Sequence, residues 1–217
     1  PRGGAPPGGG IVLDFLASPA AALAAVRQGE AQMTSPPPDP ALIARAGGIE
    51  GMRVQSVPSL FFEHMILNTS RAPLADAAVR RALAYAIDRQ QIVDVLLDGS
   101  VPVLQSVLRP QQLGYRPAFA GYAHDPGRAA DILSEAGFTR GSDGVFARDG
   151  KELRIPLVYD SGNPLRATTA RLMAEQARAA GIVIQPRALP ADRIFGSLLN
   201  QGDFTALMAA FGGGVDP

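Results

Sequence analysis

Apolar and polar positions along the chain follow two different periods. Short apolar runs bounded by Gly, Pro, Asn or Asp are typical of buried β-strands. The strands that this pattern predicts are 11–16, 61–68, 153–159, 182–186 and 204–211. Pro156 lies inside the third run and cannot donate a ladder hydrogen bond, so it indicates an edge strand or a bulge. The last run is almost continuously apolar, which favours a strand covered on both faces.

Other segments carry apolar residues at the spacing of one helical face. Asp76, Asp125 and Asn163 suit helix N-caps because their side chains accept hydrogen bonds from free amides. The helices predicted in this way lie at 20–28, 76–87, 92–97, 125–136, 164–180 and 194–199. In the last of them, the expected buried face comprises Ile194, Phe195, Leu198 and Leu199. The Pro- and Gly-rich stretch 100–124 is a predicted loop, and 141–153 a predicted surface β-ribbon.

The order of these elements predicts the fold class. From residue 153 onward, strands and helices alternate, which is typical of an α/β protein with a parallel sheet and right-handed crossovers. Ligands of open α/β sheets bind outside the carboxyl ends of the strands. The loops 159–164 and 211–217 each follow such a strand, so they predict a site at one edge of the sheet. The glycines of the second loop allow either close approach of a ligand or a sharp turn.

Composition and charge narrow the range of partners. The 217 residues carry 20 basic and 20 acidic side chains, so charge gives no reason to expect a nucleic-acid partner. No apolar run reaches the ~20 residues of a membrane span. The chain does not start with a segment resembling a signal peptide, so a secreted protein would have lost it. The absence of cysteine excludes disulfides and thiolate chemistry.

Catalytic and metal-binding patterns are also missing from the sequence. No pair of carboxylates has a spacing that indicates general acid and base work, and neither a nucleophile elbow nor a P-loop occurs. The histidines His64 and His124 lie far apart, one on a predicted strand and one before a predicted helix. We therefore predict a protein that is not an enzyme, has no metal site and needs no cofactor.

One segment identifies a family. Residues 66–89 resemble a motif of the solute-binding proteins for oligopeptides, dipeptides and nickel complexes. The matching residues are Asn68, Pro73, Asp76, Val79, Arg80, Ala82, Ala86, Ile87, Asp88 and Arg89. Residues 26–32, 122–138 and 202–217 resemble further segments of these proteins in the same order, although Gln32 stands where an Asp is usual.

The resemblance implies a substrate-binding subunit of an ABC importer. Such a protein would capture a peptide or another small solute in a cleft between two lobes, close by hinge motion and dock on the importer's membrane subunits. It would be periplasmic, or anchored outside the cytoplasmic membrane. By this resemblance, residues 57–217 would form the second lobe, incomplete at its end, with a mixed, largely parallel sheet flanked by helices. Residues 1–56 would be the tail portion of the first lobe.

The cleft edge would contain residues of both loops. The candidates are Tyr159, Ser161, Asn163, Arg166, Phe211, Gly212, Gly213, Gly214, Val215 and Asp216. The resemblance implies that Phe211 lines the cleft, but Gly213 stands where peptide-binding members carry an acid. Val215 stands where some nickel-complex binders have an aromatic residue. These two departures favour a less charged ligand.

Arg166 admits two interpretations. At the start of a helix, with the amides of Leu165 and Arg166 free, it would bind a ligand carboxylate beside Phe211, assisted by Ser161 and Asn163. Alternatively, Asn163 only caps the helix and Arg166 is solvated.

Two other functions remain as alternatives. The chain would also suit the ligand-sensing domain of a transcriptional regulator that uses the same fold. A hydrolase is the second alternative, although no nucleophile and base can be paired in this sequence.

Overall fold

The protein is described by a computed structural model, which covers residues 10–36, 39–55, 61–110 and 112–212. The chain divides into two compact units, Pro1–Ser56 and Val57–Pro217, each considered by itself. These bounds are those of the two segments named above, and the assignment of the units to lobes stays a prediction.

The first unit contains two short helices, α1 (Pro19–Gln28) and α2 (Pro40–Gly47). Helix α1 is capped by Ser18 and ends at Gly29, whose φ of 78° suits a residue without a side chain. Helix α2 was not predicted, although Asp39 before Pro40 has the same form as the helix start at Asp125. The predicted strand 11–16 is wrong: this stretch has no regular structure, and Phe15 is 96% exposed. A strand needs a hydrogen-bonded neighbour, and no described strand pairs with this segment.

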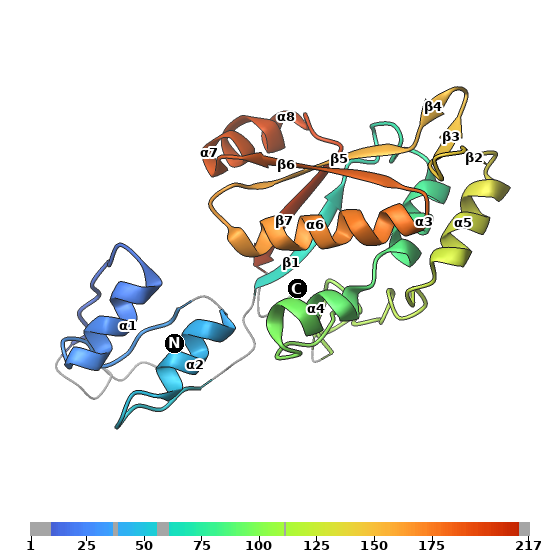
Figure 1. Ribbon diagram of the computed structural model, residues 1–217. Coiled ribbons are helices and arrows are strands. Elements are labelled where there is room, and N and C mark those ends of the chain that lie inside the picture. Colours follow the sequence, from blue (N-terminus) through green and yellow to red (C-terminus); the bar gives the residue numbers. More distant parts are fainter. Residues whose placement is uncertain (1–9, 37–38, 56–60, 111, 213–217) are drawn as a thin grey trace. The chain divides into compact units, whose positions relative to one another are not determined.

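The second unit is built on a four-stranded sheet (Figure 1). Its strands are β1 (Phe61–Leu67), β5 (Arg154–Asp160), β6 (Val183–Leu189) and β7 (Ala206–Gly212), in the order β1-β7-β5-β6. Strand β5 runs parallel to β6 and β7, whereas β1 runs antiparallel to β7. The predicted α/β class with a mixed, largely parallel sheet is therefore confirmed.

Pro156 does not mark an edge strand, because β5 is internal to the sheet. The described pairing of β5 with β7 joins Leu157 to Ala206 and Val158 to Leu207. Pro156 precedes this stretch and is matched only to Gln185 of β6. A residue without an amide donor is tolerated there because pairing with β7 begins one residue later.

Helices cover the sheet and a small second sheet stands beside it. The helices are α3 (Ala77–Ala86), α4 (Arg89–Leu97), α5 (Pro126–Glu135), α6 (Pro164–Ala179), α7 (Ala191–Arg193) and α8 (Leu199–Gln201), with a π-helical segment, Ile194–Leu198, between the last two. The predicted β-ribbon is present as β2 (Thr139–Arg140), β3 (Phe146–Arg148) and β4 (Lys151–Glu152).

The two faces of the main sheet carry separate apolar clusters. The larger cluster includes Leu83, Leu133 and Leu157 and lies between the sheet and helices α3, α5 and α6. The smaller one joins Val158 and Leu207 to Ile194 on the other face. Phe195 is 46% exposed, so the predicted buried face of 194–199 is only partly right. The extra residue in a π-turn changes the angular spacing on which that prediction depends.

The family motif has a structural role in this unit. The Asn68 amide donates to the carbonyls of Gly202 and Phe204, at 3.0 and 2.9 Å, and so ties the end of β1 to the start of β7. Asp76 accepts from the Ala78 amide at 2.8 Å and pairs with Arg148 at 2.9 Å. Burial raises the pKa of the Asp76 carboxyl, but these two donors outweigh it, and the pKa lies below its ordinary value.

Candidate functional site

The parallel strands bring the predicted loops to one edge of the sheet. Strands β5, β6 and β7 end there at Asp160, Leu189 and Gly212, and the antiparallel β1 begins there at Phe61. The Ser161 amide donates to the Leu189 carbonyl at 2.8 Å, which fixes the first loop against the end of β6. This sheet edge is the candidate ligand-binding edge.

Three aromatic rings form a partly exposed group at this edge. Phe211 is 59% exposed, and its ring centroid lies 6.0 Å from that of Phe62 and 6.4 Å from that of His64. The Phe62 and His64 centroids are 5.1 Å apart. We call these three residues the aromatic shelf. Phe62 and His64 were not predicted as site residues, because only the pairing of β1 with β7 brings them beside Phe211.

The structure describes only the first two residues of the glycine-rich loop, Phe211 and Gly212. Gly213, Gly214, Val215 and Asp216 lie outside the described residues. Gly212 has a clear packing role, since a Cβ built on it would lie 2.9 Å from Cε1 of the Phe61 ring. This contact agrees with a glycine that permits close packing, whether or not a ligand also approaches it.

Residues of the first loop, 159–166, make packing contacts and hydrogen bonds within the protein. Tyr159 is half-buried and packs against the larger apolar cluster, while Ser161 is exposed. The Asn163 side chain accepts from the Arg166 amide at 3.1 Å and caps α6. The Arg166 amide is therefore not free for an anion, contrary to the first interpretation.

Neither interpretation describes the Arg166 side chain. It is buried, with 9% of the residue exposed, and its Nε and Nη2 donate to the two carboxylate oxygens of Glu63 at 3.0 and 2.8 Å. Glu63 is paired with Ala210, and Phe62 with Phe211, so Glu63 and Phe211 lie on opposite faces of the sheet. Arg166 joins α6 to β1 on the face away from the aromatic shelf.

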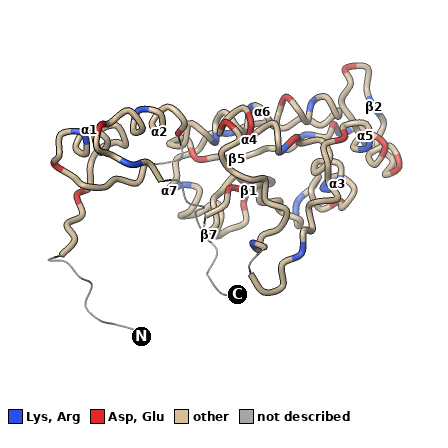
Figure 2. The backbone as a smooth tube through the Cα atoms, turned by 90° about the horizontal axis from the view of Figure 1, so that it is seen from below, with Lys and Arg blue, Asp and Glu red and all other residues tan. Residues whose placement is uncertain are grey.

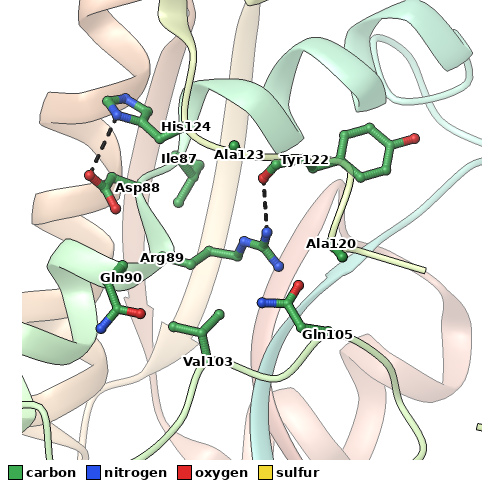
Figure 3. Close-up of a pocket in the computed structure, with 10 residues that line it drawn as sticks. All are labelled: Ile87, Asp88, Arg89, Gln90, Val103, Gln105, Ala120, Tyr122, Ala123 and His124. Carbon is green, nitrogen blue, oxygen red and sulfur yellow. Dashed lines mark hydrogen bonds and ion pairs between the residues drawn. The ribbon is translucent and has the colours of Figure 1, made fainter. Parts of the chain in front are cut away.

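A separate cavity of about 280 Å³ lies between the start of α4 and the loop 103–124 (Figure 3). The guanidinium of Arg89 extends into it, and its Nη2 donates to the carbonyls of Phe119 and Tyr122 at 3.1 and 2.9 Å. Burial lowers the pKa of Arg89. Arg89 was predicted only as a residue of the family motif, because no local signal in the sequence indicates which loop residues fold over it.

Among the residues that the structure describes, neither the distribution of charged residues nor the arrangement of possible metal ligands indicates a further site at the candidate edge or at the cavity. Figure 2 shows acidic and basic residues interspersed along the elements of the second unit. Within the described ranges, no three His, Asp or Glu residues come together in a way that could hold a metal ion. No helix in the described part of the chain is long and apolar enough to cross a bilayer.

Comparison with known proteins gives consistent matches. Protein XP55 of Streptomyces lividans is 34% identical over 164 residues, which cover 71% of this chain and 30% of that protein. The dipeptide-binding protein of Escherichia coli strain K12 is 30% identical over 169 residues, covering 77% of this chain and 29% of the relative. The crystal structure of NikZ from Campylobacter jejuni, in complex with Ni(L-His), superposes with a TM-score of 0.74 at 27% identity, over 92% of this chain and 39% of NikZ.

The chain thus spans about a third of the length of these relatives. The model of the bacterial extracellular solute-binding proteins, family 5, middle part, matches residues 2–217. This family is one of solute-binding proteins rather than enzymes, as the sequence predicted. The chain therefore belongs to the bacterial extracellular solute-binding proteins of family 5.

Proposed function

We propose that the protein is the substrate-binding subunit of an ABC importer. The observation that carries this proposal is the family match over residues 2–217. The protein would act outside the cytoplasmic membrane, in the periplasm or anchored to the membrane surface. Its ligand would be enclosed between two lobes, of which residues 57–217 supply the second and 1–56 the tail of the first. Contacts of the ligand with both lobes would favour the closed form, which the importer's membrane subunits recognise.

The ligand would contact this unit at the edge that contains the aromatic shelf. Its wall there would comprise Phe211 and Gly212 at the end of β7 and Ser161 on the first loop, whereas the Tyr159 side chain packs with the larger apolar cluster and the Asn163 side chain caps α6. The glycine-rich loop to Asp216 stays a prediction, because its remaining residues lie outside those the structure describes. Relatives bind a dipeptide, in Escherichia coli, or Ni(L-His), in Campylobacter jejuni. Phe62, His64 and Phe211 carry no carboxylate, and by the family resemblance Gly213 would stand where peptide-binding members carry an acid. We therefore propose a peptide or other small solute that presents an uncharged group to this wall.

The proposed ligand wall is tested on the full-length protein. Mass spectrometry of the small molecules that co-purify with it identifies the ligand, and calorimetry with that compound measures the dissociation constant. Phe211→Ala should raise the dissociation constant about tenfold or more, because a stacked aromatic contact is lost. Phe195→Ala is the matched control, since Phe195 is also a partly exposed phenylalanine in this unit. Equal dissociation constants for the two variants would contradict the proposed wall.

Cell fractionation tests the proposed location independently of the ligand. Recovery outside the cytoplasmic membrane supports the importer subunit. Recovery with DNA in the cytoplasm would favour the regulator alternative instead.

A further inference from the structure

The cavity at the start of α4 contains a cation without a counter-ion. The Arg89 guanidinium is partly desolvated, and both of its hydrogen bonds go from Nη2 to neutral carbonyls. No ion pair among the described residues joins it to a carboxylate. A buried charge is stable only when hydrogen bonds or an opposite charge compensate for its lost hydration. Nε and Nη1 make no hydrogen bond within the described residues, and they are not buried, so they are open to a ligand.

The acid nearest in sequence is turned away. Asp88 accepts from the Gln91 amide at 2.9 Å, and its other oxygen lies 3.5 Å from Nδ1 of His124. Figure 3 shows this pair at one side of the cavity and the Arg89 guanidinium at the other. Asp88 therefore caps α4 and holds His124, and leaves the positive charge of Arg89 unneutralised.

A second polar group in the same cavity has no partner. Oε1 of Gln105 is buried and accepts no hydrogen bond within the described residues. Figure 3 shows its amide group facing the Arg89 guanidinium across the cavity. The site thus combines a planar cationic donor, which matches a carboxylate, with an acceptor that needs a donor beside it.

We propose that this cavity binds a small carboxylate that carries a hydroxyl or amino group on the adjacent carbon. The carboxylate would take the free donors of Arg89, and the neighbouring donor would satisfy Gln105. The volume of about 280 Å³ is close to the ~300 Å³ of the smallest ligand pockets.

This site is separate from the candidate edge of the sheet. The Asp88 amide donates to Gln176 near the end of α6, whereas the candidate edge lies at the start of that helix. Along α6, Asn163 and Gln176 are roughly 20 Å apart at 1.5 Å per residue. The proposal does not depend on the importer function.

The proposed carboxylate site is tested by titrating small molecules into the protein at fixed pH and ionic strength and following the backbone amide signals by NMR. L-Lactate is the probe, propionate lacks the hydroxyl, and propionamide lacks the charge. L-Lactate should shift the amides of 87–90, 103–105 and 120–124. Propionate should bind several-fold more weakly, and propionamide should shift none of them. Shifts confined to other residues, or equal affinity for inorganic phosphate, would overturn the assignment.

Two variants separate binding from folding. Arg89→Gln should weaken lactate binding about tenfold or more, but it also removes the link to the carbonyls of Phe119 and Tyr122. Gln105→Glu keeps that link and supplies a carboxylate inside the cavity. It should abolish lactate binding and raise the midpoint of thermal unfolding. Arg171→Gln, at an exposed position of α6, should bind lactate like the wild type. Wild-type affinity in Gln105→Glu would refute the proposal.

Discussion

Two helices in the second unit have an arginine in their first turn, and one of these arginines is paired with a carboxylate whereas, within the described residues, the other is not. At α6, the Arg166 guanidinium is bidentate on Glu63 and almost fully buried. At α4, Arg89 reaches only main-chain carbonyls and extends into a cavity. Both helices have an acidic or amide N-cap, Asp88 and Asn163, so the local signals are alike. A favourable helix start therefore does not identify an anion site, because a strand distant in sequence can supply the counter-ion.

The largest effect is expected from breaking the paired arginine. Glu63→Ala leaves the Arg166 guanidinium, whose side chain is 10% exposed, without its carboxylate. The free energy of unfolding should fall by about 2–3 kcal/mol, below the value for a fully buried pair because Glu63 is half-exposed. Urea unfolding at pH 7 measures this.

The control for this variant is Glu152→Ala, which removes an acid from the half-exposed pair with Arg154. Its cost should stay below about 0.5–1 kcal/mol, as for other surface pairs. Similar costs for the two variants would show that Arg166 is hydrated rather than held by Glu63.

A third helix start gives an intermediate case. At α3, Asp76 both caps the helix and pairs with Arg148; Asp76→Asn keeps an oxygen that can cap the helix but removes the charge of the pair, so it should cost about 1 kcal/mol at pH 7. Because the pKa of Asp76 is lowered in the fold, this contribution is complete above its unfolded pKa of about 3.9 and is lost as the pH falls through the folded value. The urea midpoints of wild type and variant should therefore begin to converge below about pH 4 and meet only below the folded pKa of Asp76. A gap that is constant down to pH 2 would contradict this.

The smallest stability effect is expected at the unpaired arginine. Arg89→Gln loses two hydrogen bonds to neutral carbonyls but also removes a desolvated charge, and these contributions oppose each other. The change in unfolding free energy should lie within about 1 kcal/mol, clearly less than for Arg166→Gln in the same urea assay. The reverse order would mean that Arg89 has a counter-ion in solution, and the two helix starts would then be equivalent.

Much of the fold could be predicted because its signals are local. Helix starts at Asp76, Asp125 and Asn163 depend on side chains that bond amides two or three residues away. The alternation of strands and helices after residue 153 was sufficient for the parallel order of β5, β6 and β7. The predictions failed where the structure depends on a neighbouring strand. Residues 11–16 form no strand because no described strand pairs with them, and Pro156 lies on an internal strand rather than on an edge strand.

The sequence by itself determined the family, the α/β class, most of the helices and strands, and the edge of the sheet at which two loops meet. The tertiary structure alone decided the chemistry of the arginines and the aromatic shelf. Glu63 and Arg166 are 103 residues apart, and Phe62 meets Phe211 only through the register of β1 on β7. Hydrophobic period reports which face of an element is buried. The period carries no information about which side chain from a distant part of the sequence will contact that face, because strand pairing and helix packing decide which residues meet.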